Sequence, residues 1–520
     1  MVVMSEMDRT GVNPVIEQST DAAIQLIEVV REKGTTKFKK YDQIKQTNLS
    51  MMFAGEKVRN KKVAILSIVG NARRGKSFLL NFFVRYLEWR ETKDAGLEVT
   101  EDWLRNDEPL KKNFVWRRGK NRETKGIWMY HKPFVISNSQ NEKIAIILID
   151  TEGVFNSSGN AKSDSNIFAV STFFSSMQIY NLKQDIQEID LQVIKNFAAY
   201  SQVISNANSR KQNYLTDLMF VVRDWEHTSD HSFGTDGGKE YLDGIFKDID
   251  DIDEENKSVR KEISSAFPKI SCSLLPHPGS IVVMDSFFEG TINDIDVNFL
   301  TYTKELVEST VEVLKDSPKR IDNEDDGYLY SQYVIPFFES LVKICNSDDL
   351  PKPDDISSVY NEMICVHELG NVVRYYFQAM EEKFGNVTIN TNCEFEKFNK
   401  ECKSVALERY RQKTAHIIPN KFSDDEIELF LKYDGANENI DTALKRDSPE
   451  DEEGMDEGWS RFIFRHGLSV VAGIAIGATS TVAAPLIVSS EFYAKLGIAF
   501  AGIKSGIEFL SKIRRAFRGE

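Results

Sequence analysis

An apolar segment that ends in a glycine-rich loop constrains the fold of this chain more than any other feature. Residues 63–69 are Val-Ala-Ile-Leu-Ser-Ile-Val, and residues 70–77 continue as Gly-Asn-Ala-Arg-Arg-Gly-Lys-Ser. The apolar run predicts a strand that is buried on both faces of a sheet. Large apolar side chains then recur at helical spacing at Phe78, Leu79, Phe82, Phe83, Tyr86 and Leu87. A strand, a G-x-x-x-x-G-K-S loop and a helix in direct succession predict a phosphate-binding loop.

Each part of this loop has a physical role in holding a polyphosphate. Glycines allow backbone N–H groups to curl around phosphate oxygens, and the following helix directs the positive end of its dipole at the anion. Lys76 supplies positive charge to the β- and γ-phosphates, and Ser77 offers a hydroxyl to Mg²⁺. The loop therefore predicts a nucleoside triphosphate and Mg²⁺ as ligands.

Two arginines lie inside the same loop. Arg73 could reach over the β- and γ-phosphates and neutralise the negative charge that develops during phosphoryl transfer. A side chain that faces only solvent is the alternative, and Arg74 is a rival when the residues alone are considered.

Two further motifs fit the same chemistry. Asp150 begins an Asp-Thr-Glu-Gly tetrapeptide directly after the apolar run 144–149, where its carboxylate could hold Mg²⁺ through water and the Gly153 amide could sense the γ-phosphate. A simple turn is the better explanation of the tetrapeptide when it is considered alone, but together with the phosphate loop the motif favours a nucleotide site. Thr124 lies between the two motifs and could complete the coordination of Mg²⁺, or it could be an ordinary loop threonine.

The sequence gives weaker evidence for which nucleotide base is bound. The N-K-x-D motif of many guanine-binding proteins is absent, but Arg223 and Asp224 follow the apolar run 218–222. Asp224 could accept hydrogen bonds from the guanine N1–H and exocyclic amine, while Arg223 packs along the base. A surface ion pair is the alternative interpretation of this dipeptide.

The pattern of apolar runs predicts the fold class. Buried strands are expected at residues 63–69, 144–149, 218–222 and 280–284, and helices at residues 22–31, 165–208 and 237–267. Strands that alternate with helices predict an α/β domain with a mostly parallel sheet and helices on both faces. Beyond residue 300 only helical patterns continue, at 328–345, 356–384, 393–413 and 424–434, and they predict an all-α bundle.

The C-terminal region carries a candidate membrane segment. Residues 467–490 contain no charged side chain, and about 20 apolar residues suffice to cross a bilayer core. Gly473 and Gly477 have the G-x-x-x-G spacing that lets helices pack closely in lipid. Residues 496–503 could form the second arm of a hairpin, although a buried hairpin in a soluble protein is the alternative. The basic, amphipathic residues 507–520 could bind an anionic membrane surface or flank this hairpin.

Composition excludes several classes of partner and compartment. The net charge of −15 disfavours a nucleic-acid-binding protein, which requires a basic surface. The five cysteines are scattered without a CxxC pair, so free thiols in a reducing cytosol are expected. The first 20 residues lack the apolar core of a secretion signal, which also places the catalytic part in the cytosol.

An ordered series of motifs resembles the atlastin branch of the dynamin-like large GTPases. The series comprises G-N-A-R-R-G-K-S-F-L-L at 70–80, R-E-T-K-G-I-W at 122–128, D-T-E-G at 150–153, R-D-W at 223–225, F-G-T-D-G-G at 233–238 and S-L-L-P-H-P-G at 273–279. The segments D-T-E-G and T-K-G-I-W also resemble the guanylate-binding proteins, a sister branch. Glu152 stands where many atlastins have glutamine, and Asp285 where the family often has asparagine, so the branch stays open.

The resemblance implies a role for each matched position. It implies a catalytic arginine at Arg73 and a switch threonine at Thr124 that also contacts Mg²⁺. It implies metal contacts at Ser77 and Asp150. The nucleotide contacts that it implies are Arg73, Arg74, Gly75, Lys76, Ser77, Phe78, Glu152, Gly153, Arg223, Asp224, Val282 and Asp285.

The resemblance also implies a domain order. The expected segments are an N-terminal extension (1–50), a GTPase domain (51–315), a linker (316–327), a helical middle domain (328–440), an acidic linker (441–461), a membrane-inserted hairpin (462–506) and a short basic tail (507–520).

The implied activity is hydrolysis of GTP to GDP and phosphate by a homodimer that joins through its GTPase domains. The enzyme would be anchored in the endoplasmic reticulum membrane, with the GTPase domain facing the cytosol. It would tether and fuse these membranes, alongside other proteins that shape the endoplasmic reticulum. Two alternatives remain: a GTP-dependent tether or scaffold without efficient fusion, which the reduced C-terminus favours, and a guanylate-binding-like GTPase at other membranes.

Overall fold

The structure is a computed structural model with a defined set of described residues. These are residues 23–32, 35–40, 52–53, 55–71, 74–105, 108–116, 126–151, 161–195, 216–247, 253–285, 287–321, 327–345, 353–384, 393–415, 417, 420–428 and 430–431.

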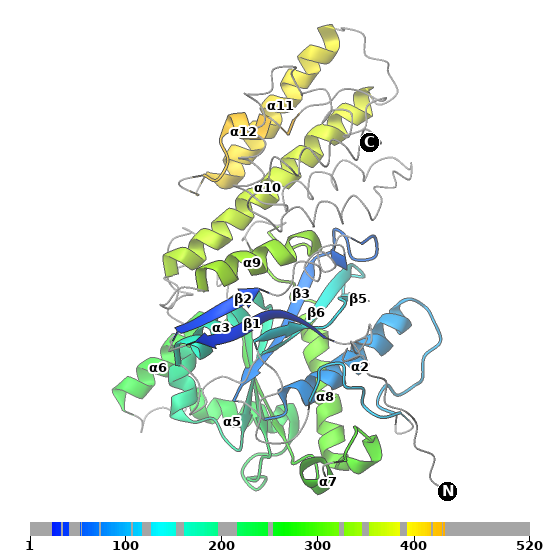
Figure 1. Cartoon of the computed structure of the whole chain (residues 1–520), viewed down its shortest axis with the longest axis vertical. Coiled ribbons are helices and arrows are strands. Elements are labelled where there is room, and N and C mark those ends of the chain that lie inside the picture. The colour runs from blue at the N-terminus through cyan, green and yellow to red at the C-terminus, as the bar shows by residue number, and fades with distance from the viewer. Residues whose placement is uncertain are drawn as a thin grey trace, which may run out of the picture.

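A nine-stranded mixed sheet forms the centre of the molecule (Figure 1). Its parallel part comprises, in spatial order, β6 (Lys143–Thr151), β3 (Val63–Gly70), β7 (Met177–Lys183), β8 (Asp217–Arg223) and β9 (Ile270–Leu275). The antiparallel part comprises β4 (Ile127–Met129) and β5 (Phe134–Ser137), which both pair with β6, and β1 (Ile24–Glu32) and β2 (Thr35–Lys40), which extend the edge beyond β4.

The register of the parallel strands brings their carboxyl ends together. Ile68 lies opposite Asp150, and Gly70 lies opposite Asn181. On the next strand, Arg223 lies opposite Lys183. Ligands of open α/β sheets bind at this edge, where the strands end and the connecting loops begin.

Helices cover both faces of the sheet because alternate side chains of each strand point to opposite faces. Ala64, Leu66 and Ile68 of β3 pack with α2 (Lys76–Asp94) and α8 (Val297–Leu314). Val63 and Ile65 belong to a second cluster on the other face. The helices in that cluster include α3 (Ala161–Phe174), α5 (Gly234–Phe246) and α6 (Glu254–Ala266). The predicted α/β core with helices on both faces is thus confirmed, but the sheet is mixed where a mostly parallel one was predicted, because β1, β2, β4 and β5 add antiparallel pairs.

A group of helices follows the sheet in sequence and lies at one end of the molecule (Figure 1). Its elements are the short η2 (Ser331–Tyr333), α9 (Val334–Cys345), α10 (Pro353–Phe384), α11 (Cys393–Thr414) and α12 (Asp424–Glu428). The predicted change from strands to helices beyond residue 300 is therefore present.

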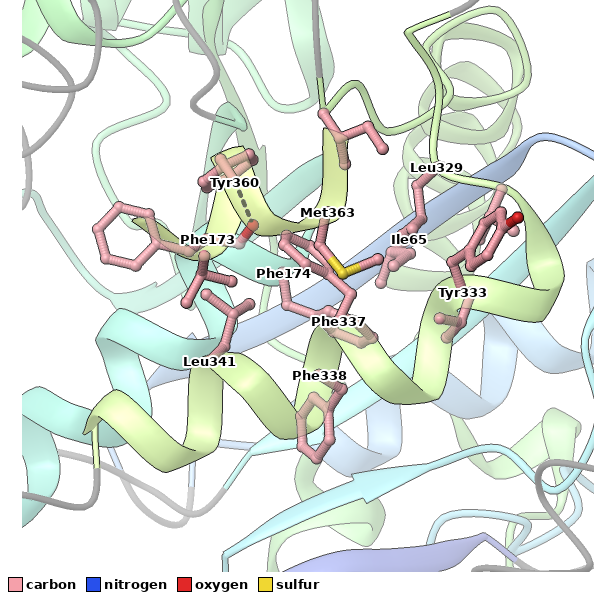
Figure 2. Close-up of a cluster of buried hydrophobic side chains, with 14 of the residues drawn as sticks. Ile65, Phe173, Phe174, Leu329, Tyr333, Phe337, Phe338, Leu341, Tyr360 and Met363 are labelled. Carbon is pink, nitrogen blue, oxygen red and sulfur yellow. Dashed lines mark hydrogen bonds between the residues drawn. The ribbon is translucent and has the colours of Figure 1, made fainter. Parts of the chain in front are cut away.

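The helices α9 and α10 pack on α3, one of the helices that cover the sheet. The rings of Phe337 and Phe338 in α9 lie 6.0 and 4.9 Å from that of Phe174 in α3. Tyr360 of α10 donates a hydrogen bond to the carbonyl of Phe173 at 2.8 Å. Figure 2 shows these side chains gathered around the end of α3. One continuous apolar core therefore joins the helices to the sheet.

Three secondary-structure predictions are wrong. Residues 280–284 form a helix, α7 (Ser280–Met284), in which Ile281 and Val283 are exposed; the strand beside β8 is the preceding β9. The predicted helix at 22–31 is wrong because Ile24–Glu32 form β1, which pairs with β2 and β4, so the sheet begins well before residue 51. The expected helix at 165–208 is interrupted by β7.

The predicted membrane hairpin at 462–506 and the tail at 507–520 lie outside the described residues. Within the parts of the chain that the structure describes, none of the helices combines the length and apolar character needed to cross a membrane.

Candidate active site

Two glycines shape the loop between β3 and α2. Gly75 has a φ of +73°, a backbone angle that residues other than glycine rarely adopt, and it directly precedes α2. A Cβ atom at Gly75 would lie 1.9 Å from Nη1 of Arg223, and one at Gly70 would lie 2.3 Å from the carbonyl oxygen of Asn181. The loop therefore lies directly against β7 and β8, and both glycines of the motif are required by geometry.

Lys76 places a positive charge within the curve of the loop. Its side chain is buried, and Nζ donates to the carbonyls of Gly70 at 3.1 Å and Asn71 at 3.2 Å. The ammonium group thus lies across the loop from the N-terminus of α2. A phosphate at this position would meet both the lysine charge and the N–H groups of the first helical turn.

Ser77 and Asp150 form a pair of oxygen donors beside the lysine. The Ser77 hydroxyl, in the first turn of α2, donates to Oδ2 of Asp150 at 2.5 Å. Both side chains are buried, and Asp150 reaches this position because β6 pairs with β3. A hydroxyl and a carboxylate suit Mg²⁺, which typically takes one or two protein oxygens and completes its shell with phosphate and water. In the described part of the chain, no cluster of three or more His, Cys, Asp or Glu side chains offers a separate metal site.

Arg223 lies beneath the loop and does not face outward from the sheet. Its side chain is only 8% exposed, its Nη1 donates to the carbonyl of Arg74 at 2.6 Å, and its guanidinium lies 5.5 Å from the ring of Phe299. Burial lowers the pKa of Arg223 below the ordinary arginine value. The predicted packing of Arg223 along a base stays a prediction.

Asp224 follows β8 directly, and its carboxylate is only partly engaged by the described residues. It adopts a φ of +55°, and its Oδ2 lies 3.2 Å from Nζ of Lys183. Its Oδ1 is buried and accepts no hydrogen bond from the residues that the structure describes. An uncommitted carboxylate oxygen at the end of β8 can accept from an N–H group of a purine base.

Three further predicted nucleotide contacts, Phe78, Val282 and Asp285, are among the described residues. The Phe78 ring is buried against Trp116 and Phe288, with centroids 5.2 and 6.3 Å away, so its side chain is part of the core. Val282 is half-buried in α7, and Oδ1 of Asp285 accepts from the Phe287 N–H at 2.9 Å.

The remaining predicted site residues cannot be placed in the same way. Arg73, Thr124, Glu152 and Gly153 lie outside the described residues. Arg74 is described: its side chain is exposed, while its carbonyl accepts hydrogen bonds from Arg223 and from Nδ2 of Asn181, the latter at 2.9 Å. Asn181 belongs to no sequence motif, and only the pairing of β7 with β3 brings it here.

The sheet with its loop matches a known family. The family model of the guanylate-binding protein N-terminal domain matches residues 40–317, which include all the described site residues. The chain belongs to this family of large GTPases. Its members hydrolyse GTP, and the predicted relationship to atlastins and guanylate-binding proteins is confirmed.

Curated relatives of this GTPase carry the name atlastin. The chain is 34% identical to Atlastin-1 of Bos taurus over 346 residues, which cover 66% of this chain and 59% of the relative. It is 32% identical to Atlastin-1 of Mus musculus over 389 residues, covering 73% and 67%. It is 30% identical to Atlastin-3 of Homo sapiens over 446 residues, covering 82% and 78%. The chain therefore spans a little under two thirds of the bovine relative, and the similarity extends beyond the GTPase domain.

Proposed function

We propose that this GTPase is anchored in the endoplasmic reticulum membrane, dimerises through its GTPase domains on binding GTP, and uses hydrolysis to tether and fuse these membranes. The observation that carries the enzymatic part is the arrangement of Lys76, Ser77 and Asp150 around a glycine loop at the carboxyl ends of β3 and β6. The similarity to Atlastin-3 over 446 residues supports the membrane part, because it reaches into the helices that follow the sheet.

Each residue of the site has a proposed role in hydrolysis. Lys76 would bind the β- and γ-phosphates, and Ser77 and Thr124, with Asp150 acting through water, would hold Mg²⁺. When bound, Mg²⁺ would neutralise phosphate charge. Arg73 stabilises the negative charge that develops on the transferred phosphoryl group. Water attacks the γ-phosphorus, and the bond to the β-phosphate oxygen breaks to give GDP and phosphate. Glu152 and Gly153 are proposed nucleotide contacts, and the Gly153 amide would sense the γ-phosphate.

Recognition of guanine is assigned to Asp224, whose free carboxylate oxygen accepts from the base. Val282 and Asp285 border the base from the segment around α7. These assignments rest on the resemblance to atlastins together with the position of Asp224 at the end of β8.

For GTP hydrolysis to drive tethering and fusion, the helices α9 and α10 must move in response to the nucleotide. α9 and α10 pack on α3, and α3 begins ten positions after Thr151, in the segment that follows Asp150. A change around the γ-phosphate would therefore reach the helices through α3. Residues 462–506 anchor the chain in the bilayer.

The test uses the full chain reconstituted into vesicles. With GTP and Mg²⁺ we expect dimers of the chain, clustering of the vesicles and mixing of their lipids, and Lys76→Ala should abolish all three. Clustering without lipid mixing would favour the tether or scaffold instead of a fusion protein. Localisation of the tagged chain to other membranes would favour a guanylate-binding-like role, and GTP hydrolysis without any membrane effect would overturn the membrane proposal.

A further inference from the structure

Two buried polar side chains hold a single carbonyl group of the phosphate loop. Asn181 Nδ2 donates to the Arg74 carbonyl at 2.9 Å, and Arg223 Nη1 donates to the same oxygen at 2.6 Å. Asn181 is 0% exposed and Arg223 is 8% exposed. They come from neighbouring parallel strands, β7 and β8, so the sheet itself presents both donors to the loop.

Peptide geometry connects this carbonyl to the ligand side of the loop. In a planar trans peptide the C=O of one residue and the N–H of the next point in opposite directions. Fixing the Arg74 carbonyl toward the sheet therefore directs the Gly75 N–H away from the sheet. That direction is the one in which the backbone of a phosphate loop presents donors to an anion.

The loop has little freedom to relax away from these two side chains. A Cβ atom on Gly75 would lie 1.9 Å from Arg223 Nη1, and one on Gly70 would lie 2.3 Å from the Asn181 carbonyl oxygen. The loop backbone is therefore seated on Asn181 and Arg223 at both of its glycines.

Other polar atoms of the two side chains are not engaged elsewhere in the described structure. Asn181 Oδ1 and Arg223 Nε are buried and have no hydrogen-bond partner among the described residues. Buried polar atoms are costly when they are left unpaired. Among the described residues, the bonds to the Arg74 carbonyl are thus hydrogen bonds that offset the cost of burying this amide and this guanidinium.

We propose that Asn181 and Arg223 are positioning residues of the GTPase, which orient the Arg74–Gly75 peptide so that its N–H faces the phosphates. This inference rests on the proposed binding of GTP at this loop. It gives Arg223 a role at the phosphate loop beside the predicted contact with the base, while Asp224 reads the base alone. Loss of either positioning residue should then weaken binding of every nucleotide by the same factor, whatever its base.

The experiment measures the affinity of the purified full chain for fluorescently labelled GDP and IDP, which differ only in the exocyclic amine. Asn181→Leu and Arg223→Met each remove a donor, and we expect each to raise Kd about tenfold for both nucleotides. Arg223→Lys retains a cationic donor and should recover part of the affinity. Asp224→Asn should instead change the ratio of the GDP and IDP affinities.

A matched control separates positioning from general damage to the core. Gln178 is also a buried amide on β7, but it bonds to Thr172 at 3.0 Å and Ser171 at 3.1 Å, away from the loop. Gln178→Leu should lower the melting temperature as Asn181→Leu does, while leaving the Kd for GDP unchanged.

Three results would overturn the inference: unchanged affinity in folded Asn181→Leu and Arg223→Met, an effect confined to GDP, or an equal loss of affinity in Gln178→Leu. Failure of the unmodified chain to bind either nucleotide would overturn the proposed function and this inference together. The inference can fail by itself when the unmodified chain still binds both nucleotides, and that result leaves the proposed function intact.

Discussion

Replacing Gly75 with alanine tests whether the phosphate loop is seated on Arg223. Two costs can be worked from the structure. Placing a Cβ on a residue with a φ of +73° costs about 1–2 kcal/mol. The new methyl would also lie 1.9 Å from Nη1 and 3.1 Å from Cζ of Arg223, so the guanidinium or the loop must move.

Either movement breaks the 2.6 Å hydrogen bond from Arg223 to the Arg74 carbonyl. A hydrogen bond from a charged group contributes about 1.5–3 kcal/mol. The total cost of Gly75→Ala in the present loop conformation is therefore about 3–5 kcal/mol. We expect it to be divided between a lower melting temperature and a weaker affinity for GDP.

Gly96 provides the matched control. It has a φ of +75°, but a Cβ atom there would have no neighbour within 4 Å. Gly96→Ala should therefore carry only the backbone cost of about 1–2 kcal/mol, with GDP affinity unchanged. The remaining difference of about 2–3 kcal/mol corresponds to about 30- to 150-fold in affinity if it falls wholly on the nucleotide.

Calorimetric titration of GDP and thermal unfolding of both variants measure these two contributions. Equal melting temperatures and equal GDP affinities in Gly75→Ala and Gly96→Ala would refute the reasoning. They would show that the contact with Arg223 places no constraint on the loop.

Three further predictions concern the chemistry and the attachment of the helices. Lys76→Ala should weaken GTP binding itself, whereas Arg73→Ala should retain binding and lose most hydrolysis; titration and phosphate release distinguish them. Tyr360→Phe should lower the free energy of unfolding by about 1 kcal/mol, seen by denaturant titration, because a buried hydrogen bond is lost. Burial lowers the pKa of Lys319 to about 7. The unfolded state then holds the extra proton up to about pH 10, so this lysine makes stability rise between about pH 7 and 10. Lys319→Met should remove that rise in pH-dependent unfolding curves, and its persistence would contradict the assignment.

The strands that could be predicted from the sequence are those whose pattern is continuous. β3, β6 and β8 are buried on both faces and contain runs of apolar residues, which are typical of central parallel strands. β7 was not predicted because the polar residues Gln178 and Asn181 interrupt its apolar pattern, although both side chains are fully buried. Residues 280–284 have the composition of a strand, but β9 already fills the position beside β8.

The residues of the candidate site also differ in how far the sequence could predict them. Lys76, Ser77 and Asp150 could be found because they stand at fixed offsets in short motifs, and the structure brings them together. Asn181 could not, because it meets Arg74 across 107 sequence positions through the pairing of two strands. Arg223 was recognised because it follows the apolar run 218–222 and so ends β8, but the direction of its side chain depends on how closely the loop approaches the sheet.

The contacts at the end of α3 could transmit a change at the nucleotide site to the helices that follow the sheet. The last carbonyls of a helix lack partners within the helix. Here they are bound from outside: Tyr360 of α10 donates to the Phe173 carbonyl at 2.8 Å, and Lys319 donates to the Ser175 carbonyl at 3.0 Å. Lys319 comes from the segment after α8, so the connecting chain and the helical group both hold the same end of α3. The other end follows Asp150. Under the proposed function, a shift of α3 on GTP hydrolysis would therefore change both attachments, because both hold the same end of this helix.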